Sequence, residues 1–141
     1  MIKVILHGCN GKMGQMVTEL CSQEEDVKIV AGIDAVHHGA GEYPVYRDIF
    51  YCNIVADVVI DFSKAAAVDR LLDYCVEKKV PCVLCTTGLS EEQLDRVREA
   101  SKKTALLRSA NMTLGVNLLM KVLKEAVAAL APAGFDVEIV E

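Results

Sequence analysis

Three glycines spaced three residues apart mark the segment of the chain best suited to chemistry. Residues 8–14 read Gly-Cys-Asn-Gly-Lys-Met-Gly, between an apolar strand-like run and a run with helical periodicity. The first N–H groups of a helix lack partners within it, and the helix dipole favours negative charge there. The segment therefore predicts a diphosphate site. Its Gly-x-x-Gly-x-x-Gly spacing is related to the Gly-x-Gly-x-x-Gly dinucleotide fingerprint but does not match it.

A carboxylate follows this turn at the distance that a dinucleotide site requires. Asp34 comes 20 residues after Gly14, directly after an apolar run over 27–33. A carboxylate at that place accepts hydrogen bonds from the adenosine ribose hydroxyls, which favours NAD. No arginine follows Asp34 to pair with a 2′-phosphate, but Lys12 offers a positive charge, so NADP stays open. The alternative interpretation of Asp34 is a solvated acid at a strand end.

Polar residues also follow three later strand-like runs. They are Asp61-Phe62-Ser63, Thr86-Thr87-Gly88 and, after the last of these runs, Asn111. Ligands of open parallel sheets bind at the carboxyl ends of the strands, so all three places are candidates. A plain turn explains Thr86-Thr87-Gly88 equally well, and Asn111 has the alternative role of closing a turn.

Two other groups of residues are more simply explained by a structural role than by catalysis or cofactor binding. His37 and His38 lie in a glycine-rich loop after the expected adenosine site, so we expect a solvated pair and not an acid–base pair. Met13, Met16 and Met112 are expected to pack in the core more than to contact a cofactor, although Met13 and Met112 suit both.

The elements that must position these residues alternate along the chain. Strands are expected over 2–6, 27–33, 57–61, 80–85, 104–107 and 135–140, and helices over 12–22, 64–79, 90–102 and 114–130, with 35–56 irregular. Ser63 is the expected N-cap of the second helix, and Ser90 with Gln93 resembles a capping box. Strands separated by helices predict an α/β fold: an open parallel sheet with right-handed crossovers and helices on both faces.

Length, composition and charge exclude several classes of protein. The 141 residues suffice for one ordinary domain, and 52% hydrophobic residues with a mean hydropathy of +0.30 exclude disorder. No apolar run reaches the roughly 18 residues of a membrane span, and the N-terminus lacks the pattern of a signal peptide, so we expect a cytoplasmic protein. A net charge of −5 with interspersed signs argues against nucleic acid as a partner.

Six cysteines are expected to be reduced and mostly buried. Cys82 and Cys85 form a Cys-x-x-Cys pair, but positions i and i+3 of a strand face opposite sides of the sheet, so no metal site is predicted. Cys9 is either a reactive thiol near a helix N-terminus or, as we expect, a small residue that fills a tight turn.

In order and spacing, the motifs at 8–14, 61–63, 86–88 and 109–117 resemble the 4-hydroxy-tetrahydrodipicolinate (dihydrodipicolinate) reductase family of lysine and diaminopimelate synthesis. The resemblance implies a Rossmann-like domain that uses NADH or NADPH. It places Gly8, Cys9, Asn10, Gly11, Lys12 and Met13 at the pyrophosphate and Asp34 at the adenosine ribose. It places Phe62, Cys85, Thr86, Thr87, Ser109, Ala110, Asn111 and Met112 around the nicotinamide and its ribose.

The same resemblance implies that 1–113 is the dinucleotide-binding domain. Residues 114–141 would be a linking helix and the first strand of a substrate and oligomerisation domain that is otherwise absent. The family's His-His-x-x-Lys and Gly-Thr segments, which would serve a cyclic dicarboxylate substrate, lie beyond Glu141. We therefore expect a part of the enzyme that binds cofactor without turnover and has no catalytic residue of its own, whereas the intact enzyme would be a homo-oligomer.

Two alternatives from other classes stay open. One is a non-catalytic NAD-sensing module with a Rossmann fold. The other is a different Gly-x-x-Gly oxidoreductase, which would need a nucleophilic cysteine at a later strand-to-helix turn and a histidine downstream of it.

Overall fold

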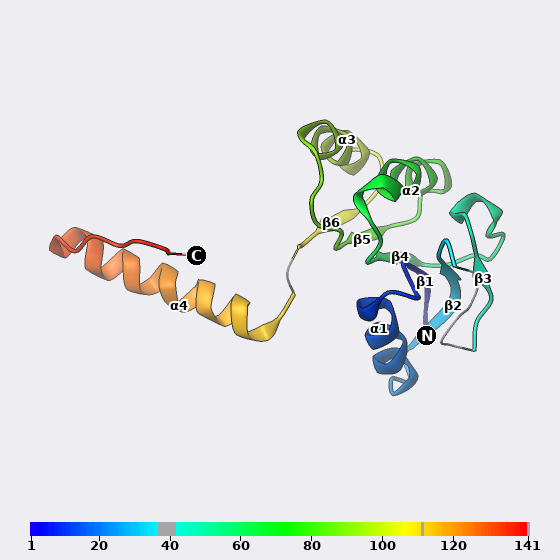
Figure 1. Cartoon of the computed structure of the whole chain (residues 1–141), viewed down its shortest axis with the longest axis horizontal. Coiled ribbons are helices and arrows are strands. Elements are labelled where there is room, and N and C mark those ends of the chain that lie inside the picture. Colours follow the sequence, from blue (N-terminus) through cyan, green and yellow to red (C-terminus); the bar gives the residue numbers. More distant parts are fainter. Residues whose placement is uncertain (37–41, 111, 141) are drawn as a thin grey trace. The chain divides into compact units, whose positions relative to one another are not determined.

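The computed structural model describes residues 1–36, 42–110 and 112–140. The chain forms two compact units, Met1–Ala110 and Asn111–Glu141. In the first unit, the described residues form a six-stranded sheet in the order β3-β2-β1-β4-β5-β6, with every neighbouring pair parallel (Figure 1). The strands are β1 (Ile2–His7), β2 (Val27–Ile33), β3 (Val45–Tyr46), β4 (Val58–Asp61), β5 (Cys82–Leu84) and β6 (Leu106–Arg108).

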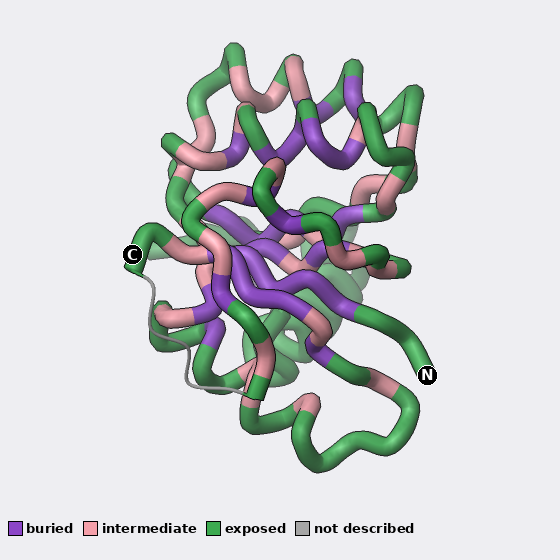
Figure 2. The backbone as a smooth tube through the Cα atoms, turned by 90° about the vertical axis from the view of Figure 1, so that its right-hand side faces the viewer, coloured by how far each residue is buried: buried purple, intermediate pink, exposed green. Residues whose placement is uncertain are grey.

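Helices cover both faces of this sheet, as expected. Helix α1 (Lys12–Ser22) lies on one face, and α2 (Ala65–Lys78) and α3 (Glu91–Ser101) lie on the other (Figure 1). The core accordingly divides into a smaller cluster around Val4 and Leu6 on the α1 side and a larger one around Ile5, Leu71 and Leu84 on the other. The buried segments follow the strands and the inward faces of the helices (Figure 2).

The region 35–56, expected to be irregular, contains two short elements in its described part. Val45 and Tyr46 form β3 by pairing with Gly32 and Ile33 of β2, and Ile49–Tyr51 form the 3-10 helix η1. Asp48 caps η1, because its side chain accepts a hydrogen bond from Phe50 N at 2.8 Å. A strand of two residues is too short for a sequence pattern to reveal it.

The expected cap of α2 is wrong, whereas the expected capping box of α3 is confirmed. The N-cap of α2 is Lys64, and no described side chain caps it. Ser63 instead belongs to the turn after β4, where its N–H donates to Asp61 Oδ1 at 3.2 Å. Ser90 and Gln93 exchange two side-chain to backbone hydrogen bonds of 3.2 Å at the start of α3.

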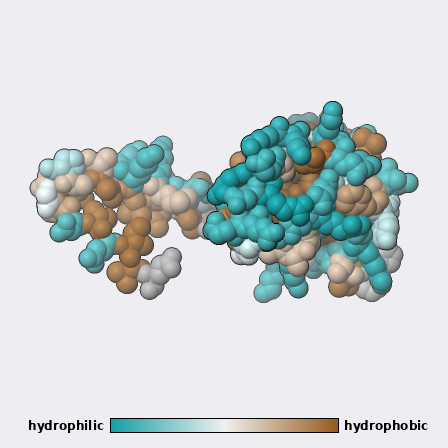
Figure 3. All heavy atoms as spheres, turned by 90° about the horizontal axis from the view of Figure 1, so that it is seen from above, coloured by the Kyte–Doolittle hydropathy of each residue, from teal (hydrophilic) through white to brown (hydrophobic). Residues whose placement is uncertain are grey.

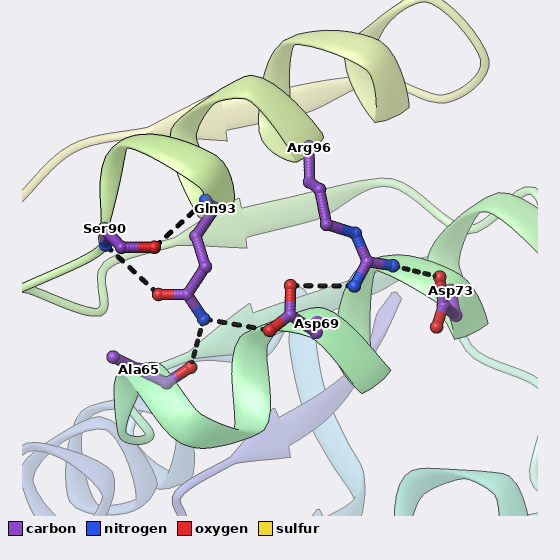
Figure 4. A network of polar contacts seen from close by, with 6 residues as sticks. All are labelled: Ala65, Asp69, Asp73, Ser90, Gln93 and Arg96. Atoms are coloured by element: carbon purple, nitrogen blue, oxygen red, sulfur yellow. Dashed lines mark hydrogen bonds and ion pairs between the residues drawn. The ribbon is translucent and has the colours of Figure 1, made fainter.

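A surface network joins α2 to α3 (Figure 4). Gln93 Nε2 donates to Ala65 O at 2.7 Å and to Asp69 Oδ2 at 3.1 Å. One turn further along α3, Arg96 forms ion pairs with Asp69 at 2.8 Å and with Asp73 at 2.6 Å. These contacts fix the two helices side by side on the same face of the sheet.

The second unit consists of α4 (Leu114–Leu130), the 3-10 helix η2 (Ala131–Ala133) and an extended tail. None of the residues of α4 is buried, and its apolar side chains form a hydrophobic surface (Figure 3). The expected strand over 135–140 is not formed, because no described strand pairs with this segment and an isolated strand leaves its backbone groups without ladder partners. No helix in the described ranges is long and apolar enough to cross a membrane.

Candidate nucleotide-binding site

The turn after β1 is packed so tightly that two of its glycines admit no side chain. Gly8 has a φ of +79°, and a Cβ there would lie 2.6 Å from the carbonyl oxygen of Phe62. A Cβ at Gly14 would lie 2.3 Å from the carbonyl oxygen of Gly8. These two glycines let the turn fold onto itself and against the end of β4.

Gly11 differs from the other two glycines because it has space. It is the N-cap of α1 with a φ of −69°, and the nearest atom to a Cβ placed there is Gly8 O at 3.4 Å. No described side chain caps the helix, and the first turn carries no acidic residue. Lys12 is exposed and has no ion-pair partner among the described residues. The start of α1 thus offers open backbone N–H groups and a free cation, the features that bind an anion.

Asp34 is brought to this turn, as the sequence predicted. Its Oδ2 accepts a hydrogen bond from Asn10 N at 3.0 Å, and its Oδ1 accepts one from Val36 N at 3.1 Å. Asn10 Nδ2 also donates to Val36 O at 2.6 Å. Asp34 is therefore not merely a solvated acid at a strand end, because it ties the turn after β2 to the turn after β1.

A buried polar network that sequence reasoning missed lies at the ends of β1, β4 and β5. His7 Nδ1 lies 2.8 Å from Asp61 Oδ1, and Thr86 Oγ1 donates to Asp61 Oδ2 at 2.5 Å. All three residues are buried, and Asp61 is completely so. His7 and Asp61 are register partners in the parallel ladder. The signal in the sequence is a polar residue at the end of each of two apolar strands.

Asp61 is ionised in this setting despite its burial. Burial alone would raise its pKa, but hydrogen bonds and charge from His7, together with bonds from Ser63 and Thr86, hold the pKa below its ordinary value. An ionised carboxylate only accepts hydrogen bonds, which matches three donors converging on it.

Three of the predicted site residues have buried side chains. They are Cys9, Cys85 and Thr86. The hydroxyl of Thr86 already donates to Asp61, so it has no proton left to donate to a ligand. Burial and the charge of Asp34 raise the pKa of Cys9 to about 11, so Cys9 is the small buried residue we expected and not a reactive thiolate. Thr87 is exposed, and Phe62 is half-buried.

The structure says less about the remaining residues of the predicted site and about the histidine pair. Ser109 N donates to Leu84 O at 3.1 Å, which puts Ser109 beside the end of β5, and Ala110 is exposed. Met112 belongs to the second unit. Asn111, His37 and His38 lie outside the described residues.

The expectation that the methionines are core residues is wrong. Met13, Met16 and Met112 are each about half exposed. On α1 the buried residue is Gly14, which lets the helix start close to the turn, and Met13 and Met16 lie on exposed parts of the helix. The six cysteines are free thiols, as expected, and five of them are buried.

A parallel sheet in this strand order, with a glycine turn between β1 and α1 and a carboxylate after β2, defines a nucleotide-binding domain of the Rossmann type. The family model described as "Dihydrodipicolinate reductase, N-terminus" matches residues 2–112, and the chain belongs to that family. The resemblance inferred from the motifs is therefore confirmed.

Relatives agree with this assignment. A protein of Clostridium novyi (strain NT) named 4-hydroxy-tetrahydrodipicolinate reductase is 45% identical over the whole chain, which covers 56% of that relative. One of the same name from Caldanaerobacter subterraneus subsp. tengcongensis is 48% identical over the whole chain and is 55% covered. The dipicolinate-bound dihydrodipicolinate reductase of Paenisporosarcina sp. TG-14 superposes with a TM-score of 0.79 at 26% identity, over 91% of this chain and 54% of that one. The chain spans about half the length of the curated relatives it matches.

Proposed function

We propose that this chain is the cofactor-binding part of an NAD(P)H-dependent reductase that converts 4-hydroxy-tetrahydrodipicolinate to tetrahydrodipicolinate in lysine and diaminopimelate biosynthesis. The observation that carries the proposal is the open start of α1, where Gly11 has space and no described side chain caps the helix. Family membership over 2–112 supports the reaction class. When bound, the nicotinamide cofactor supplies the hydride.

In this proposal, the turn from Gly8 to Met13 surrounds the diphosphate. The backbone N–H groups of Lys12 and Met13 donate to it, because those of the preceding residues of the turn already have partners within the protein, and the Lys12 side chain adds a positive charge. Asp34 accepts from the adenosine ribose hydroxyls with the lone pairs that Asn10 and Val36 leave free. The residues after β4, β5 and β6 form the nicotinamide end. Within the first unit, they are Phe62, Cys85, Thr86, Thr87, Ser109 and Ala110.

NADH is the preferred cofactor in this proposal. Asp34 places a negative charge where the 2′-phosphate of NADPH would approach, and like charges repel. Lys12 is the cation of the neighbouring turn that can offset this charge, so NADPH binds more weakly but still binds. Titration with both cofactors at low and high salt measures the difference, because screening weakens the repulsion.

The substrate in the proposal is a cyclic dicarboxylate, consistent with the dipicolinate bound to the Paenisporosarcina relative. Turnover would need the segment that follows this part in the relatives, so we expect the 141 residues to bind cofactor without reducing substrate. Residues 114–141 would be the start of the substrate and oligomerisation domain, whose remainder would cover the apolar surface of α4. Reductase activity in the purified 141-residue chain would refute this division.

Gly11→Ala tests the diphosphate site. The structure has room for the methyl group, yet the group would stand where the diphosphate must approach the backbone. We expect the substitution to weaken NADH binding by at least about tenfold, measured by the fluorescence of NADH, while the chain stays folded.

Gly115→Ala is the matched control, because a Cβ at Gly115 meets nothing within 4 Å and the residue lies outside the proposed site. Thermal melting of Gly11→Ala reports the small cost of replacing the N-cap glycine of α1 by alanine, about 0.5–1 kcal/mol. Equal NADH affinity in the wild-type chain and both variants would contradict the proposed diphosphate site.

A further inference from the structure

One buried carboxylate contacts residues at or just beyond the ends of three strands. His7 directly precedes Gly8 of the diphosphate turn, Ser63 lies in the turn from β4 to α2, and Thr86 is the second residue of the turn from β5 to α3. Asp61 Oδ1 accepts from His7 Nδ1 and Ser63 N, and Asp61 Oδ2 accepts from Thr86 Oγ1. All three turns belong to the site proposed above.

The backbone ladder does not fix these turns by itself. Between β1, β4 and β5, the last backbone bonds at the carboxyl ends run from Phe62 N to His7 O and from Cys85 N to Asp61 O, each 2.9 Å long. Gly8 N also donates to Ile33 O of β2 at 2.8 Å, which holds the diphosphate turn to β2 but not to the turns after β4 and β5. Beyond Phe62 and Cys85, no backbone hydrogen bond between the described residues of these three turns is found, although Gly8 packs closely against Phe62 and Ser63. The side-chain bonds of Asp61 therefore continue the connection between neighbouring strands past the point where the sheet ends.

We propose that Asp61, with His7 and the Thr86 hydroxyl, is a positioning network that sets the distance between the diphosphate turn and the nicotinamide end of the cofactor site. This inference rests on the proposed function. The three side chains act through the backbone that they hold: Asp61 is completely buried, and the Thr86 hydroxyl is already engaged. They are positioning residues and not catalytic residues.

The adenosine side of the site is held by a different set of contacts. Asp34 binds Asn10 N and Val36 N, and this set shares no hydrogen bond with the Asp61 network. Loosening the Asp61 network should therefore weaken the binding of a whole dinucleotide, whereas a ligand that carries only the adenosine diphosphate end should bind nearly as before. A role limited to overall stability would weaken both ligands in proportion.

Thr86→Val removes the hydroxyl with little change of shape, and Thr86→Ser restores the hydroxyl. In the 141-residue chain, we expect Thr86→Val to raise the Kd of NADH about tenfold, as fits the loss of a hydrogen bond to a charged group. The Kd of ADP, measured by titration calorimetry, should change by less than about twofold, as expected for an independent site. Thr86→Ser should bind NADH within about threefold of the wild-type chain.

Thr104→Val is the matched control. Its hydroxyl also makes one hydrogen bond, to Val80 O at 3.2 Å, in a half-buried position before the amino ends of β5 and β6, away from the proposed site. We expect it to leave both affinities unchanged. The ratio of the NADH and ADP affinities does not depend on the folded fraction, so it remains informative where a variant is partly unfolded.

The possible results separate the positioning network from the proposed cofactor site. A raised NADH-to-ADP Kd ratio in Thr86→Val, restored in Thr86→Ser and absent in Thr104→Val, supports the positioning network. An unchanged ratio in Thr86→Val, or an equal change in Thr104→Val, overturns the network and leaves the cofactor site standing. A wild-type chain that binds neither ligand overturns the proposed function, and the network with it.

Discussion

Two polar networks connect neighbouring elements of the same domain, and they differ in their exposure to water. The Asp61 network lies at the carboxyl ends of β1, β4 and β5 and is completely buried at its centre. The network of Gln93 and Arg96 joins α2 to α3 at the surface, where the Arg96 side chain is 41% exposed (Figure 4). Both use a carboxylate that receives several donors.

The difference in exposure determines how much each carboxylate destabilises the protein when it loses a hydrogen-bond donor. A buried carboxylate must be fully supplied with donors, because removing one leaves a charge that water cannot reach. An exposed carboxylate that loses a donor is solvated at once, and salt screens its ion pairs. The buried network is thus a constraint on geometry, whereas the surface network is a modest stabiliser.

The largest effect is expected at the centre of the buried network. Asp61→Asn should lower the free energy of unfolding by about 3 kcal/mol, because an amide nitrogen would face donors in a site that water does not reach. Urea unfolding near neutral pH measures the loss. Asp57→Asn is the control: Asp57 begins the same chain segment and accepts from Lys3 N at 2.7 Å, but in an exposed position. If Asp57→Asn lowered the free energy of unfolding as much as Asp61→Asn, burial would not explain the difference between the two networks.

The acid limit of stability should also depend on Asp61. Its pKa is lower in the folded chain than its ordinary value of 3.8, so folding favours the ionised form. The stabilisation is complete above the unfolded pKa and is lost as the pH falls through the folded pKa. The difference in Tm between the wild-type chain and Asp61→Asn should therefore shrink as the pH falls below about 4. A difference that grows under acid would contradict an ionised Asp61.

The two networks also show what sequence can reveal. Ser90 and Gln93 lie three positions apart on one helix, so their spacing predicted the capping box. His7 and Asp61 are separated by 54 positions, and only the strand register brings them together. Residues close in sequence on one helix can be paired from their spacing alone. A network between strands can be predicted only when the pairing and register of those strands are known.

The same distinction explains the other outcomes. The glycine turn and Asp34 were predictable because a strand, a turn and a helix follow each other directly. Alternation over 135–140 predicted which side chains would share a face, but a strand forms only with a partner, which the pattern does not specify. The exposure of Met13 was not predictable either, because helical periodicity shows which side chains share a face but not how deeply each one is buried.

A smaller effect is expected where the surface network is half-buried. Gln93→Ala removes two donated bonds and half of the capping box, and it should cost about 1 kcal/mol of unfolding free energy. Glu92→Ala, one residue earlier in the first turn of α3, changes only a favourable charge near the helix start. A cost for Gln93→Ala that equals the cost for Asp61→Asn would show that the surface network constrains the fold as strongly as the buried one.

The smallest effect is expected at Arg96, although Arg96 makes two ion pairs. Arg96→Ala should cost less than about 1 kcal/mol, because the side chains of Asp69 and Asp73 are 41% and 61% exposed. Part of that cost should disappear in about 1 M salt, where the Debye length falls to about 3 Å. Urea unfolding of the wild-type chain and Arg96→Ala at low and high salt measures it. A cost that salt does not reduce would mean that the aliphatic part of Arg96, packed over the α2–α3 contact, matters more than its charge.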